Sequence, residues 1–205
     1  MVFWLATALF PTHASTVIGP AGHAYSYVPS DGVTWLDANA AAQNTLYSGV
    51  YGHLGTIFSQ SENDFVLNNL LAGVTGSAWL GGSDAQSEGS WRWLSGEQFW
   101  QGGVTGTAGS DILYANWLSG AEPNNYNGYE NYLSMFGLAA PQGPYSAPGK
   151  WNDLTYNQPG GTSSFSIQGY VVEFDLPLAV PVPAAFWLFG SGLFGLLGLT
   201  RRSRR

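Results

Sequence analysis

The sequence predicts an α+β fold in which two helices pack on small antiparallel sheets, with a long irregular loop region over about 114–153. Two stretches, 34–46 and 59–71, begin with a capping residue and continue with apolar residues at helical spacing. Short apolar and aromatic runs bounded by Gly and Ser-Asp-Gly turns are typical of strands. The segment 114–153 is rich in Gly, Asn and Pro, which favours loops.

Both helices have a recognisable start. The first has Thr34 as N-cap with Asp37 three residues later, and the second has Ser59 and Glu62 as a capping box. The face of the first helix that we expect in the core carries Trp35, Ala38, Ala42 and Leu46. The stripe expected on the second carries Phe65, Val66, Asn69 and Leu70.

Strands are expected at 25–28, 52–57, 79–82, 89–93 and 170–175, whereas the Gly-rich stretch 99–109 is expected to be irregular. The histidines His13 and His23 stand at no metal-ligand spacing, and we interpret His53 as a packed structural residue.

Charge is sparse, at 9% of the residues, and aromatic residues make up 15%. All 13 acidic residues lie within 31–175, where Arg92 and Lys150 are the only Lys or Arg residues. This argues against nucleic acid as a partner, because nucleic-acid binding needs a basic surface, and it suits an exported protein that binds cations. The chain has no Cys, so it has neither a disulfide framework nor a thiolate metal site.

The most informative stretch is 122–153. It contains three carboxylates and at least two amide oxygens in the motifs Glu122-Pro123-Asn124, Glu130-Asn131 and Trp151-Asn152-Asp153. Calcium takes roughly six to eight such oxygen ligands. Carboxylates crowded together without a cation raise one another's pKa, and a divalent cation removes that conflict. A cis Glu-Pro bond would turn the side chains of Glu122 and Asn124 toward one point. The alternative is a surface loop whose acids are merely solvated.

These motifs, in this order and with Glu130 six residues after Asn124, resemble the sugar-binding calcium site of C-type lectins. The resemblance implies that Ca²⁺ is held by Glu122, Asn124, Glu130, Asn152 and Asp153. It implies that the first four also contact the carbohydrate. Glu-Pro-Asn is similar to the mannose-type motif, so mannose-type or glucose-type hydroxyls are favoured over galactose.

The resemblance extends over 25–175 through the stretches 52–57, 79–82, 88–93 and 170–173, and implies a C-type lectin-like domain over 22–176. Family disulfides are missing: Ala42 and Val172 occupy paired Cys positions, and we expect them to be in contact. Tyr132 stands where another Cys is frequent. A second family calcium site is not expected, because Asn125 and Asn131 are neutral.

The amino terminus resembles a secretory signal peptide over 1–14, with an apolar run over 2–10 and small residues at Thr12 and Ala14. A basic n-region is missing, which a truncated start would explain. The alternative is an ordinary first strand.

The carboxyl terminus has a Pro-rich linker at 177–183, an uncharged stretch at 184–200 and a basic tail at 201–205. We expect 184–200 to be a transmembrane helix of about 25 Å, with the tail cytoplasmic and the body outside. A buried core helix is the alternative. This order resembles the PEP-CTERM sorting signal, carried here by Val180, Pro181, Pro183, Arg201 and Arg202. It implies processing by an exosortase-like enzyme and a place at the bacterial membrane, cell surface or extracellular matrix.

Three functions follow. The first is calcium-dependent carbohydrate binding by an exported, non-enzymatic protein. The second is a structural or adhesive surface protein in which calcium only orders the loop, because fold alone does not prove sugar binding. The third is a glycosidase that uses Glu122 and Glu130 as a carboxylate pair, although metal chelation explains their amide neighbours better.

Overall fold

The computed structural model describes residues 15–177. The predicted signal peptide, membrane helix and basic tail lie outside the described residues, as do the sorting residues Val180, Pro181, Pro183, Arg201 and Arg202. Within 15–177, neither helix has the length and apolar character that a membrane crossing requires.

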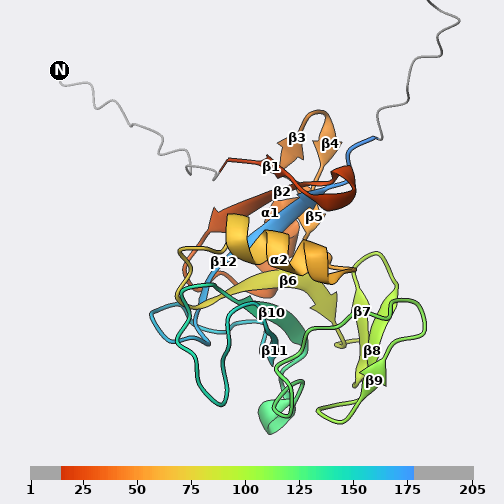
Figure 1. Cartoon of the computed structure of the whole chain (residues 1–205), viewed down its shortest axis with the longest axis vertical. Coiled ribbons are helices and arrows are strands. Elements are labelled where there is room, and N and C mark those ends of the chain that lie inside the picture. The colour runs from red at the N-terminus through yellow and green to blue at the C-terminus, as the bar shows by residue number, and fades with distance from the viewer. Residues whose placement is uncertain (1–14, 178–205) are drawn as a thin grey trace, which may run out of the picture.

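The strands form one branched sheet of ten strands and a separate two-stranded hairpin, β3–β4 (Figure 1). The main path runs β1-β2-β12-β6-β7-β8-β9, with β5 beside β12, β10 beside β6 and β11 beside β10. The first strands are β1 Val17–Ile18, β2 Ala24–Pro29, β3 Leu46–Tyr47, β4 Val50–Tyr51, β5 His53–Leu54 and β6 Ser77–Ser83. The later ones are β7 Ser90–Trp93, β8 Gln98–Gln101, β9 Thr107–Ala108, β10 Tyr132–Phe136, β11 Trp151–Leu154 and β12 Ile167–Phe174. Short 3-10 turns lie at Pro20–Gly22 and Tyr126–Gly128.

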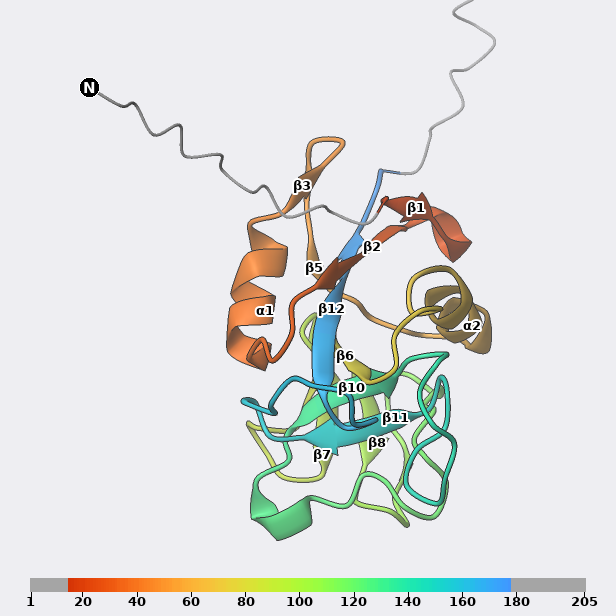
Figure 2. The same cartoon turned by 90° about the vertical axis from the view of Figure 1, so that its left-hand side faces the viewer.

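The two predicted helices are present as α1 Trp35–Gln43 and α2 Gln60–Asn69, on opposite sides of β2 and β12 (Figure 2). Both predicted N-caps are confirmed: Thr34 Oγ1 accepts from Asp37 N at 3.1 Å, and Ser59 Oγ accepts from Glu62 N at 3.3 Å. The predicted α+β fold is therefore confirmed at the level of its helices and sheets.

The predicted end of the first helix is wrong. The α1 helix stops at Gln43, because the side chains of Asn44 and Thr45 donate to the carbonyls of Ala40 and Ala41 and cap the last turn. Leu46 therefore starts β3 and is exposed instead of lining the core. In α2, Asn69 is likewise exposed, whereas Val66 is buried.

The stretches expected to be irregular contain strands. The 99–109 segment includes most of β8 and all of β9, and the 114–153 loop region includes β10 and most of β11. Strand β10 lies between β6 and β11, so both of its edges are paired and nearly all of its residues are buried. Such a strand has no polar alternation to reveal it in the sequence.

The missing disulfide is replaced by close packing. Ala42 and Val172 are both fully buried in one core cluster, as the predicted contact requires. Gly52 lies against both of them, and a Cβ atom added there would stand 2.5 Å from Val172 Cγ1 and 3.1 Å from the Ala42 carbonyl oxygen. Tyr132 packs its ring on Trp35 at 4.8 Å. Apolar contacts thus hold α1 to β12 without a covalent bridge.

Candidate functional site

Strand β11 carries two of the predicted ligands, Asn152 and Asp153, and Trp151 fixes its position. The Trp151 indole is fully buried among other aromatic rings, and its Nε1 donates to Asn63 Oδ1 of α2 at 2.8 Å. Successive strand residues point to opposite faces of a sheet. Accordingly, Asn152 lines a cavity of about 610 Å³, and Asp153 lines a smaller one of about 210 Å³.

The Glu122-Pro123 peptide bond is cis, as the sequence suggested, and the two flanking side chains meet. The amide Nδ2 of Asn124 donates to Glu122 Oε2. The Asp153 carboxylate accepts from the backbone N–H groups of Asn124 at 3.1 Å and Asn125 at 2.7 Å. Asp153 thus holds the start of this loop against β11.

Glu130 is folded back toward the same loop. Its N–H donates to Asn125 Oδ1 at 3.1 Å, and its Oε2 accepts from Tyr126 N at 3.0 Å. The backbone of Asn125 and of Asn127 is left-handed, a conformation that asparagine tolerates better than most residues. These two asparagines turn the chain through η2, Tyr126–Gly128, and return it to the cavity.

Four of the five predicted ligands share one cavity wall. Glu122, Asn124, Glu130 and Asn152 all line the 610 Å³ cavity. Asp153 does not line it but lies close enough to the Glu122 side chain to raise the pKa of Glu122. The loop and the strand therefore bring together the residues that the sequence singled out. Each of these side chains offers a carboxylate or amide oxygen as a metal ligand, and Asn124 and Asn152 also carry an amide nitrogen.

No Lys or Arg of the described residues lies beside the three carboxylates. Within 15–177 the Lys and Arg residues are Arg92, which binds Gly96 and Gln98, and Lys150, which binds Asn116. Burial, and then Asp153, raise the pKa of Glu122 to about 9, and burial raises the pKa of Glu130 to about 7. Burial also raises the pKa of Asp153. As expected from the sequence, the group resists full ionisation unless a cation joins it.

A further acidic edge, which the sequence analysis missed, lines the 210 Å³ cavity next to Asp153. It consists of Asp84 and Glu88, four residues apart after β6. Asp84 is 2% exposed, and burial raises its pKa to about 7. Among the described residues, Asp84 Oδ1 and Asn131 Oδ1 are buried without a hydrogen-bond partner. The signal available in the sequence was an acidic pair directly after a buried strand.

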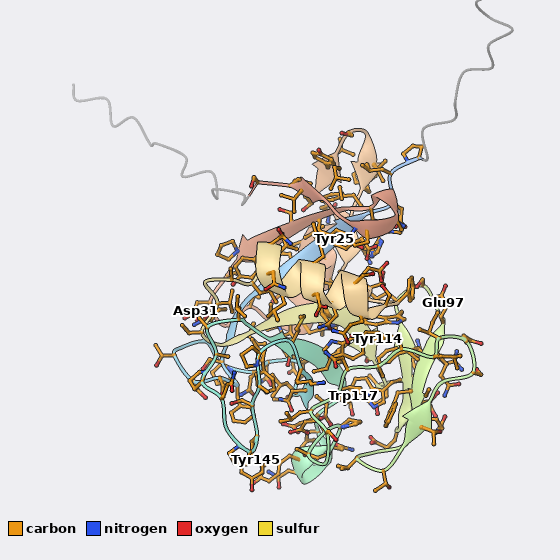
Figure 3. The ribbon with its side chains drawn as sticks, in the orientation of Figure 1. Tyr25, Asp31, Glu97, Tyr114, Trp117 and Tyr145 are labelled. Atoms are coloured by element: carbon orange, nitrogen blue, oxygen red, sulfur yellow. The ribbon has the colours of Figure 1, made fainter. Side chains whose placement is uncertain are left out.

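Two tyrosines were also missed. Tyr126 and Tyr145 line the larger cavity and are 67% and 64% exposed (Tyr145 is labelled in Figure 3). Exposed aromatic rings beside a cluster of oxygen donors offer an apolar wall next to a polar one.

An α+β fold with an acidic, amide-rich loop beside an open cavity is the arrangement of a ligand-binding domain. A family model described as the Lectin C-type domain matches residues 32–161. This match covers more than half of the sequence, and the chain belongs to the C-type lectin family.

Relatives and solved structures agree with this assignment. Halomucin of Haloquadratum walsbyi is 33% identical over 157 residues, which cover 75% of this chain but 1% of halomucin. A protein named lectin from Pleurodeles waltl is 32% identical over 134 residues, covering 63% of this chain and 61% of that protein. The structure of the C-type lectin CEL-I from Cucumaria echinata superposes with a TM-score of 0.54 at 22% identity. It covers 83% of this chain and all of CEL-I, and shows the same fold.

Proposed function

We propose that this domain is a calcium-dependent carbohydrate-binding module without enzymatic activity. The observation that carries the proposal is the convergence of Glu122, Asn124, Glu130 and Asn152 on one open cavity. Asp153 holds the backbone of Asn124 beside them, and no Lys or Arg of the described residues balances the carboxylates.

The donor set suits calcium. Glu122, Glu130 and Asp153 offer carboxylate oxygens, and Asn124 and Asn152 offer amide oxygens, which are the hard ligands that Ca²⁺ prefers. The pKa values of Glu122 and Glu130 are raised in the absence of an ion, so a bound cation would stabilise their ionised forms. When bound, Ca²⁺ would supply Lewis acidity for two vicinal sugar hydroxyls, since five side chains leave part of its roughly six to eight positions free.

The chain's own residues would orient those hydroxyls. A carboxylate accepts a hydrogen bond and an amide Nδ2 donates one, so the neighbouring Glu122 and Asn124 offer both at one edge of the cavity. Tyr126 and Tyr145 offer ring faces for the apolar side of a sugar. We infer mannose-type or glucose-type sugars from the Glu-Pro-Asn order.

Asp84 and Glu88 support a second, auxiliary cation beside the first, although the neutral Asn125 and Asn131 gave no reason to expect one from the sequence. Asp84 Oδ1 and Asn131 Oδ1 are both buried without a hydrogen-bond partner, and Asp84 lines the same small cavity as Asp153. A cation in that cavity would give the Asp84 oxygen a partner. An ion there would hold the loop from its other side.

A glycan array of the whole chain, with and without a calcium chelator, tests the proposal. Binding to mannose-type glycans that disappears with chelator and returns with Ca²⁺ is the expected result. Calcium binding with no bound glycan would favour a structural or adhesive role instead. Release of reducing ends would favour a glycosidase that uses Glu122 and Glu130.

We further propose export to the bacterial surface or extracellular matrix, with the tail from about Pro181 removed by an exosortase-like enzyme. The support is the order Pro-x-Pro, apolar stretch and Arg cluster in the sequence. Mass spectrometry of the surface form should show no peptide that contains Arg201 or Arg202.

A further inference from the structure

A second group of metal-ligand side chains lies away from the lectin cavity. It comprises His23 just before β2, His53 in β5, and Glu173 and Asp175 at the end of β12. Tyr25, whose hydroxyl donates to Glu173 Oε1, and Tyr145, at the cavity, lie toward opposite ends of the domain in Figure 3. The group joins three chain segments that are far apart in the sequence.

Three of its four residues have ligand atoms close enough for a single small ion, and His53 is joined to them through Asp175. Ligand atoms of His23, Glu173 and Asp175 all lie within 4.8 Å of one another. His23 Nδ1 is 3.1 Å from Asp175 Oδ1, and His53 Nε2 is 3.3 Å from Asp175 Oδ2. Zinc bonds of ~2.0–2.2 Å in a tetrahedron place neighbouring ligand atoms about 3.3 Å apart. The His23–Glu173 contact, at 2.5 Å, would lengthen when an ion enters.

The hydrogen bonds around the group orient it for coordination. His53 Nδ1 is 2.8 Å from the Leu54 carbonyl oxygen, which only accepts, so Nδ1 carries the proton. The other ring nitrogen, Nε2, therefore faces Asp175. Two acceptors that face each other need a proton or a cation between them. A histidine held by its other nitrogen on a backbone carbonyl is the usual outer shell of a metal ligand.

Glu173 is oriented in the same way. Its Oε2 accepts from the N–H of Thr56 at 2.7 Å and from the Thr56 hydroxyl at 2.5 Å. This leaves Oε1 facing His23 and the Tyr25 hydroxyl. The carboxylate is 1% exposed, so its orientation is fixed by the core.

We propose that His23, His53, Glu173 and Asp175 bind one Zn²⁺ or similar transition-metal ion. Two imidazole nitrogens distinguish this site from a calcium site, because Ca²⁺ prefers oxygen ligands and imidazole suits zinc, nickel and copper. The side chains of His23, His53 and Asp175 are 30%, 27% and 64% exposed, so an ion can enter from solvent. In a chain without Cys, the ion would tie β2 and β5 to the end of β12.

Calorimetry and thermal unfolding of the whole chain test this site. ZnCl₂ is the probe, at neutral pH, with saturating Ca²⁺ so that the lectin loop is occupied. One Zn²⁺ per chain and a higher unfolding temperature are expected, because a ligand that binds only the folded state stabilises it. His23→Gln and His53→Gln should each weaken zinc binding by more than the ~10–100-fold that loss of an outer-shell partner costs.

The matched control is Glu130→Gln, which should weaken calcium binding and leave zinc binding unchanged. Both histidines are partly exposed, and retained calcium binding by their variants shows that they fold. The proposal is overturned if the wild-type chain binds no zinc at this stoichiometry. It is equally overturned if both histidine variants bind zinc as the wild type does, since zinc would then bind elsewhere.

Discussion

Glu173 and Glu122 are both buried, at 1% and 3% exposure, yet the chain surrounds them in opposite ways. Glu173 receives hydrogen bonds from Tyr25 and from the backbone and hydroxyl of Thr56, and His23 lies beside it. Glu122 has one donor, Asn124, and its other neighbour is a second carboxylate, Asp153. The protein supplies several hydrogen-bond donors to Glu173, whereas Glu122 has a single donor and a second carboxylate beside it.

This difference separates a self-sufficient end of the domain from a dependent one. Around Glu173, donors of the chain stabilise the fold, and a metal ion would only add to them. Around Glu122, the carboxylates oppose one another, so the loop needs a cation to be stable in its ionised form. If the proposed calcium site is correct, the scaffold would stay folded while the loop responds to calcium.

The largest expected effect comes from Asp153→Ala. It removes a carboxylate and the acceptor for the N–H groups of Asn124 and Asn125, so calcium stabilisation and sugar binding should both be lost. Calorimetry with Ca²⁺ and then with mannose measures the two events. Asp64→Ala, at an exposed position of α2, is the matched control and should leave both intact. Unchanged calcium affinity in Asp153→Ala would exclude these residues as the calcium site.

Glu173→Ala should lower the stability of the fold and leave calcium binding intact. It leaves the donors of Tyr25 and Thr56 without an acceptor, and unsatisfied buried groups cost ~1–3 kcal/mol each. We expect the free energy of unfolding to fall by about 3 kcal/mol in urea, with calcium affinity unchanged. A loss of calcium affinity in this folded variant would mean that the two ends are coupled and would break the comparison.

The double change Glu122→Gln with Asn124→Asp should alter sugar preference alone. It keeps the number of oxygen ligands and the net charge, but exchanges which residue accepts and which donates to a hydroxyl. Calcium affinity should stay within about threefold, while mannose-type binding falls by about tenfold, or ~1.4 kcal/mol. Competition between mannose and galactose on the same protein measures the change. An unaltered preference would show that other residues choose the sugar.

A final expected effect is on the pH dependence of stability without calcium. The pKa of Glu122 rises from 4.5 to about 9 on folding, so the folded state binds more protons within that window. Stability should therefore fall as pH rises from about 4.5 to about 9. Saturating Ca²⁺ should remove this fall, because calcium requires the ionised ligands. Urea unfolding at several pH values measures it, and stability that rises with pH in chelator would contradict the assignment of Glu122.

Much of the fold could be predicted because its signals are local. Helix caps such as Thr34 and Ser59 depend on residues three positions apart, and both predictions were correct. The predicted end of α1 was wrong because the apolar spacing continues to Leu46. The side chains of Asn44 and Thr45 cap the helix before that residue. Strand β10 was missed because its pairing with both β6 and β11 buries nearly all of its residues.

The ligand set over 122–153 could be proposed from the sequence by itself, since its motifs name oxygen donors at fixed spacing. Only the tertiary structure decided which groups share a space. It put Asp84 beside Asp153 and left Asp84 Oδ1 and Asn131 Oδ1 unpaired. It also brought His23 to Glu173, 150 residues away, where no spacing indicated a site. Sequence fixes short-range chemistry, whereas contacts between distant strands arise from the register of β2, β5 and β12, which packing of the whole core selects.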